Sequence, residues 1–127
     1  MASAHFELHV TDTVQARDFY GDLLGWRFEA MGDLDYHLVL ADGIGPDGPL
    51  SGALMPRNVP APPVGTGPRG AVISFRVADV DTVYAKALEI GGEEAMPPTD
   101  FNGFGRLAYI EDGQGNIIGL MTRAEEK

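Results

Sequence analysis

The chain lacks cysteine and long apolar runs, and it has few basic residues. Its 127 residues include no Cys, and 9 Lys and Arg stand against 19 Asp and Glu, which gives a net charge of -10. Without cysteine there are no disulfides, thiolate metal ligands or cysteine nucleophiles. The negative charge repels phosphate backbones and anionic membranes, so nucleic acid and membranes are not expected partners. Because no apolar stretch is long enough to span a membrane and no signal pattern opens the chain, we expect a cytoplasmic protein.

The second half of the chain repeats the first half at an offset of 67 residues. The matches are Val10 with Val77, Asp12 with Asp79, Gly25 with Gly92, and the run beginning at Asp47 with the run beginning at Gln114. A period this long differs from that of a solenoid and indicates two copies of one supersecondary module. We expect a single domain over residues 1–127, with module one at 1–56, a linker at 57–70 and module two at 71–123.

Module one begins with alternating polar and apolar residues from His5 to Val10, which predict a strand with one apolar face. Asp12 is suited to cap a helix that ends at Gly25, and Gln15 takes the third helical position of a capping box. The apolar stripe of this helix comprises Ala16, Phe19, Tyr20 and Leu23. Three short strands are predicted to follow, at Trp26 to Met31, Tyr36 to Leu40 and Leu50 to Met55.

Module two repeats this order with a strand from Ala71 to Val77 and a helix that Asp79 caps and Gly91-Gly92 ends. The helical stripe is Val80, Val83, Tyr84 and Ala87, and further strands are predicted near Glu93 to Met96, Arg106 to Glu111 and Asn116 to Thr122. The segment from Pro97 to Gly105 is expected to be either a mobile loop over a ligand or an ordinary strand connection. The repeated order predicts an α+β fold of two tandem βαβββ modules, whose mixed sheets form a cup with the helices outside.

Short motifs then carry a resemblance to a known family. They are Val10-Thr11-Asp12 before Arg17-Asp18-Phe19-Tyr20 and Leu24-Gly25-Trp26, Val77-Ala78-Asp79 before Gly91-Gly92, and Glu111-Asp112 before Gly115-Asn116. By these motifs the chain resembles the vicinal oxygen chelate superfamily, which includes glyoxalase I (lactoylglutathione lyase), bleomycin resistance proteins and extradiol dioxygenases. Further segments are similar to its small single-domain glyoxalase-related branch, namely His5-Phe6-Glu7-Leu8, Gly52-Ala53-Leu54-Met55-Pro56 and Gly103-Phe104-Gly105-Arg106.

In metal-dependent members, the resemblance implies a divalent ion held by ligands on the first and last strand of each module. Only His5 matches such a position with a metal-binding side chain. The other three positions fall on Val72, Gly52 and Gly119, and no His, Asp or Glu occurs within 50–55, 71–77 or 116–122. We therefore expect no catalytic metal. A metal would need His5 together with Glu7 or His9, and their spacing along a strand makes a shared ion awkward.

Ligand-binding candidates lie on the strand faces that the alternation predicts. His5, Glu7 and His9 share one face, where they either line a wet cavity or act as catalytic groups in proton transfer. Ser74 and Arg76 take the positions of Glu7 and His9 in module two. Arg76 and Arg106 are expected either to bind an anionic ligand group or to pair with internal carboxylates. The candidate cavity walls are Tyr36, His37, Met55, Phe101, Phe104 and Tyr109.

These observations favour a protein that binds a small organic molecule, including an anionic one, in the cup without a catalytic metal. One alternative is a metal-dependent lyase, isomerase or dioxygenase with a non-standard ligand set. Another is a non-catalytic interaction domain. The residues do not decide between a catalyst and a binder. The resemblance implies a homodimer.

Overall fold

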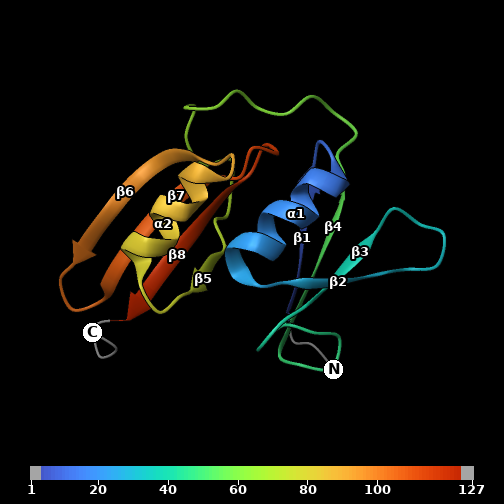
Figure 1. Cartoon of the computed structure of the whole chain (residues 1–127), viewed down its shortest axis with the longest axis horizontal. Coiled ribbons are helices and arrows are strands. Elements are labelled where there is room, and N and C mark those ends of the chain that lie inside the picture. The colour runs from blue at the N-terminus through green and yellow to red at the C-terminus, as the bar shows by residue number, and fades with distance from the viewer. Residues whose placement is uncertain (1–3, 124–127) are drawn as a thin grey trace. The chain divides into compact units, whose positions relative to one another are not determined.

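The computed structural model describes residues 4–123, which form two helices and eight strands (Figure 1). The chain divides into two compact units, unit one at Met1–Ala61 and unit two at Pro62–Lys127. The boundary lies inside the predicted linker. Neither helix in residues 4–123 has the length and apolar character of a membrane span.

Each unit contains one helix and one four-stranded sheet. Unit one comprises β1 (Ala4–Val10), α1 (Thr13–Leu24), β2 (Arg27–Ala30), β3 (His37–Leu40) and β4 (Leu50–Pro56). Unit two comprises β5 (Ser74–Arg76), α2 (Val80–Glu89), β6 (Glu93–Phe101), β7 (Gly105–Glu111) and β8 (Ile117–Arg123). The sheet orders β1-β4-β3-β2 and β5-β8-β7-β6 are equivalent, and in both sheets the first and last strands pair in parallel. The predicted α+β fold of two βαβββ modules is confirmed.

The core of unit one lies between α1 and one face of its sheet. Asp12 caps the helix by accepting hydrogen bonds from the backbone N–H groups of Val14 and Gln15, and Gly25 ends it with a positive φ of 73°. The whole predicted helical stripe is buried. Trp26 is buried, stacks on Tyr20 of the helix with a ring-centroid distance of 4.8 Å, and lies 6.0 Å from the ring of Phe6 on β1. The sheet face away from the helix is here called the open face (Figure 1).

Unit two differs from the sequence prediction in three places. Regular strand β5 covers only Ser74–Arg76, although Ile73 and Val77 continue the backbone hydrogen bonding to β8. Tyr84 was expected in the core, but it is half-buried and its hydroxyl donates to Glu94 at 2.5 Å. Strand β6 extends to Phe101, so much of the predicted 97–105 loop is strand. Pro97 and Pro98 are tolerated there because β6 is an edge strand with two register shifts.

The start of β7 depends on a glycine at position 105. Gly105 has φ 144°, and a Cβ there would overlap the carbonyl oxygen of Thr122 on the paired strand. Gly103 has φ 80° with nothing near its Cβ position.

Gly105→Ala should therefore destabilise the protein by at least about 3 kcal/mol, because the backbone must shift. Gly103→Ala should cost about 1 kcal/mol through its dihedral alone. Urea denaturation measures both, and equal costs would contradict the explanation.

Candidate functional site

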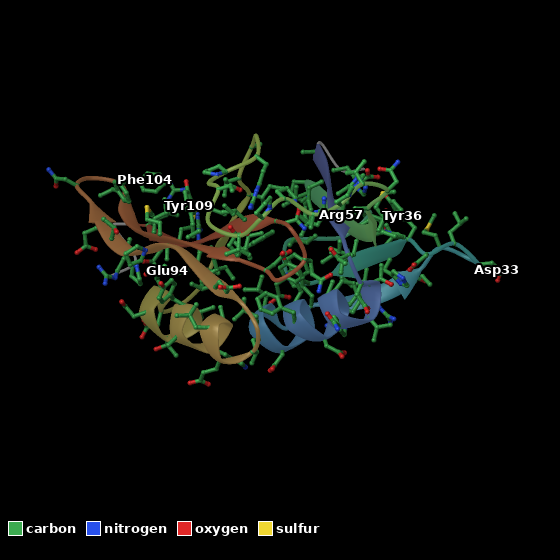
Figure 2. All side chains as sticks on the ribbon, turned by 90° about the horizontal axis from the view of Figure 1, so that it is seen from above. Asp33, Tyr36, Arg57, Glu94, Phe104 and Tyr109 are labelled. Atoms are coloured by element: carbon green, nitrogen blue, oxygen red, sulfur yellow. The ribbon has the colours of Figure 1, made fainter. Side chains whose placement is uncertain are left out.

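The open face of unit one is polar. Parallel pairing places His5 beside Ser51, Glu7 beside Ala53, and His9 beside Met55. Tyr36 immediately precedes β3 and reaches the same face, as Figure 2 shows by its position away from α1. The strand alternation thus brings the predicted residues His5, Glu7, His9, Tyr36 and Met55 together on one surface.

A chain of hydrogen bonds joins these polar side chains. His5 Nδ1 lies 2.6 Å from Ser51 Oγ, and His5 Nε2 lies 2.8 Å from the Tyr36 hydroxyl. The Tyr36 hydroxyl donates to Glu7 Oε2 at 2.7 Å. Glu7 Oε1 in turn faces His9 Nε2 at 3.5 Å. The sequence prediction missed Ser51, because a serine 46 residues away from His5 gives no local signal.

The direction of this chain follows from the ionisation of Glu7. Hydrogen bonding by Tyr36 lowers the pKa of Glu7, and the nearby His9 acts in the same direction, so Glu7 is a carboxylate that only accepts. Tyr36 must then donate its proton to Glu7, and His5 Nε2 must donate to the Tyr36 oxygen. A neutral His5 therefore accepts the Ser51 hydroxyl at Nδ1. Burial, with the Glu7 hydrogen bond, raises the pKa of Tyr36 to about 12, which keeps the phenol protonated.

His37 does not belong to this surface, although it was a candidate cavity wall. It pairs in register with the buried Leu54, and its Nε2 lies 2.6 Å from Asp35 Oδ1. Thr13 and Arg17 of α1 help to lower the pKa of the same Asp35 carboxyl, and its bond with His37 is the largest cause. His37 thus lies on the helix side of the sheet, where it holds the end of the β2–β3 connection.

The open face of unit two is largely apolar. Ser74 of β5 pairs with Gly119 of β8, and Gly119 pairs with Tyr109 of β7, so these residues form one row across the sheet. Half-buried apolar neighbours on this face are Met96, Leu107 and Met121. Phe104 lies in the β6–β7 turn and is 50% exposed. Figure 2 shows Tyr109 and Phe104 away from α2.

The two arginines proposed as anion anchors have different surroundings. Arg106 extends to the helix side, where Nε and Nη2 donate to Asp81 of α2 at 2.8 Å each. Its Nη1 also lies 3.2 Å from Asp100 Oδ1. Arg106 therefore follows the internal ion-pair alternative. Arg76 follows the buried Phe75, so it lies on the open face, and it is exposed.

A buried ion pair that the sequence did not predict joins Arg69 of the linker segment to Glu111 of β7. The Glu111 side chain is 2% exposed, and Arg69 Nη1 and Nη2 donate to its two oxygens at 3.0 and 3.3 Å. The backbone N–H of Gly65 donates to Glu111 Oε2 at 3.2 Å. Arg69 Nη2 also donates to the carbonyl of Pro63 at 2.7 Å. Residues 63–69 therefore wrap around the Glu111 carboxylate and donate hydrogen bonds to both of its oxygens.

The positions at which metal-dependent relatives place their ligands do not fit a metal in this chain. The register corrects one of them: Gly52 pairs with Phe6 and faces the helix, so Ala53 corresponds to Gly119. Neither residue has a donor side chain, and a Cβ at Gly119 would overlap Ser74 Oγ. Both nitrogens of His5 already have partners. Within residues 4–123, no three His, Asp or Glu side chains gather as a metal site.

Comparison with known proteins agrees with this architecture. The family described as the Glyoxalase/Bleomycin resistance protein/Dioxygenase superfamily matches residues 2–120. The chain belongs to this superfamily. The resemblance seen in the sequence motifs is thereby confirmed.

Individual relatives share the fold over nearly the whole chain. The anthracycline biosynthesis protein DnrV of Streptomyces peucetius is 30% identical over 98% of this chain and 50% of its own length. A glyoxalase/bleomycin resistance protein from Streptomyces sp. CB03234 is 27% identical with a TM-score of 0.63, covering 94% of this chain and 98% of that one. TnmS3, an antibiotic binding protein from the same strain, is 25% identical with a TM-score of 0.66, covering 98% and 96%. The chain spans 42% to 50% of the length of the curated relatives it matches.

The hydrogen bond between Tyr36 and Glu7 is open to a direct test. Glu7→Gln should lower the pKa of Tyr36 from about 12 toward the ordinary value of 10, because the carboxylate no longer stabilises the protonated phenol. Burial is the larger cause and remains, so the pKa should stay above 10. NMR titration of the tyrosine ring carbons measures this. Tyr84, whose pKa of about 12 depends on burial and Glu94, serves as the internal control. An unchanged Tyr36 titration would show that the bond is not formed.

Removing one partner of the Arg69–Glu111 pair should lower the free energy of unfolding, because the other partner is then buried without a counter-charge. Arg69→Met leaves a buried carboxylate without its cation and should destabilise unit two by about 3 kcal/mol. The double variant Arg69→Met, Glu111→Leu should recover much of this loss. Arg106→Met removes a more exposed ion pair, so its cost should be smaller than that of Arg69→Met. Chemical denaturation compares the three variants, and an Arg69→Met cost no larger than that of Arg106→Met would refute the assignment.

Proposed function

We propose that this protein binds a small organic molecule at the open faces of its two sheets and needs no catalytic metal to do so. One observation carries the proposal: the single residue that matches a family ligand position, His5, is held through both ring nitrogens by Ser51 and Tyr36. The aligned positions Ala53 and Gly119 offer no donor side chain. The site is thus built for hydrogen bonding rather than for coordination.

The two open faces offer different chemical groups to a ligand. Unit one offers a polar surface around Glu7, whose side chain is 39% exposed. Unit two offers Tyr109, Met96 and Met121, side chains suited to apolar and aromatic groups. Arg76, which is exposed on the open face of unit two, is the contact that we propose for an anionic group of the ligand.

The relatives support an organic ligand of this kind. One solved structure with 25% identity is described as an antibiotic binding protein, and one curated relative with 30% identity as an anthracycline biosynthesis protein. Both descriptions concern organic compounds rather than a macromolecular partner. A homodimer of the chain is a further part of this proposal.

The test is ligand binding after metal removal. 2-Naphthylmethanol, a neutral aromatic alcohol, should shift backbone amide signals of β1 and β8 in two-dimensional NMR spectra. Extensive EDTA treatment should leave the dissociation constant unchanged within about twofold, because no ion holds the ligand. Binding lost on chelation and restored by Zn²⁺ or Ni²⁺ would contradict the metal-free proposal. Absence of any shift at open-face residues would contradict small-molecule binding there.

A further inference from the structure

We propose that the open face of unit one is a hydrogen-bond-acceptor subsite centred on Glu7, which takes a hydroxyl or ammonium group of the organic ligand. This inference rests on the proposed function and specifies the chemistry of one part of the ligand. It also means that carboxylate and phosphate groups are rejected at this face.

The first argument is the direction of the hydrogen bonds. The Tyr36 hydroxyl donates to Glu7, and His5 Nε2 donates to the Tyr36 oxygen, so both donors are directed within the chain. When His5 is neutral, the Ser51 hydroxyl is likewise directed to His5 Nδ1. These donors are therefore already used and would have to break a bond of 2.6 to 2.8 Å to contact a ligand acceptor.

The second argument is the unused capacity of Glu7. A carboxylate can accept about four hydrogen bonds, and Glu7 receives one from Tyr36 and has a longer contact of 3.5 Å with His9. Its side chain is 39% exposed, so the remaining lone pairs are within reach of a bound molecule. The Tyr36 bond fixes Oε2 in place, and Oε1 lies at the longer distance from His9. Glu7 is therefore a carboxylate with a fixed position and with unused hydrogen-bond acceptor capacity.

The third argument is electrostatic. The chain has a net charge of -10, which attracts cations and repels anions approaching any acidic position. Two titratable residues contact Glu7: Tyr36, which stays neutral, and His9. His5 is hydrogen-bonded to Tyr36 and is therefore the next titratable residue along the chain of hydrogen bonds. None of these three is a permanent cation, and the guanidinium of Arg57 on the same side of the sheet donates to the backbone carbonyl of His9. An ammonium ligand would consequently meet a carboxylate whose partners are Tyr36 and His9 rather than Lys or Arg, and a carboxylate ligand would meet repulsion.

The experiment uses three probes that share one aromatic ring system: 2-naphthylmethylamine, 2-naphthylmethanol and 2-naphthoate. Each is titrated at pH 7 into the full chain, and the shifts of the amides of residues 5–9 give the affinity at unit one. The amine and the alcohol should shift these amides, and the naphthoate should not. Glu7→Gln should weaken amine binding by about tenfold, because a charge-assisted bond is lost, and alcohol binding by a smaller factor. The ratio of the two losses identifies which donor the subsite prefers.

Two control variants separate this inference from its alternatives. Glu89→Gln changes the net charge equally at an exposed end of α2, and should leave all affinities within about twofold. Tyr36→Phe frees Glu7 Oε2 and should maintain or strengthen amine binding. Naphthoate binding at residues 5–9, or amine binding that survives Glu7→Gln, would overturn the acceptor subsite while leaving small-molecule binding intact. No shift with any probe would instead overturn the proposed function itself.

Discussion

The hydrogen bond that Tyr36 donates to Glu7 determines the polarity of the whole open face of unit one. Since an ionised carboxylate cannot donate, the proton of Tyr36 is assigned, and the roles of His5 and Ser51 follow in turn. An imidazole held at both nitrogens is a poor metal ligand, because coordination would break one of these bonds. The same chain of hydrogen bonds supports the proposal that His5 acts in this molecule through hydrogen bonding.

The duplicated topology supplies two equivalent scaffolds with different surfaces. Each unit uses an aspartate-capped helix to bury one sheet face, and the parallel pairing of first and last strands brings distant residues into register. On the open side, Glu7 beside Ala53 in unit one is replaced by Ser74 beside Gly119 in unit two. Duplication with divergence thus gives unit one an open face with a chain of hydrogen-bonded polar side chains, and unit two an open face on which Met96, Leu107 and Met121 surround Tyr109.

Local patterns in the sequence predicted most of the fold, and long-range pairing decided much of the site. The alternation from His5 to Val10 and the caps at Asp12 and Asp79 are read directly from neighbouring residues, and the structure confirms them. The contacts of His5 with Ser51 and of Arg69 with Glu111 join residues 46 and 42 positions apart, so no local signal reveals them. The misplacement of Gly52 shows the same limit, because a slip of one residue moves a side chain to the opposite sheet face.

The tautomer of His5 tests the central claim most directly. Long-range ¹H–¹⁵N NMR on the ligand-free protein, at a pH where His5 is neutral, distinguishes a protonated Nε2 from a protonated Nδ1. The hydrogen-bond direction derived above predicts a proton on Nε2 and an accepting Nδ1, and the spectrum should not change on addition of Zn²⁺. A proton on Nδ1 would mean that Tyr36 donates to His5 instead of Glu7, which would contradict the assigned polarity of the open face.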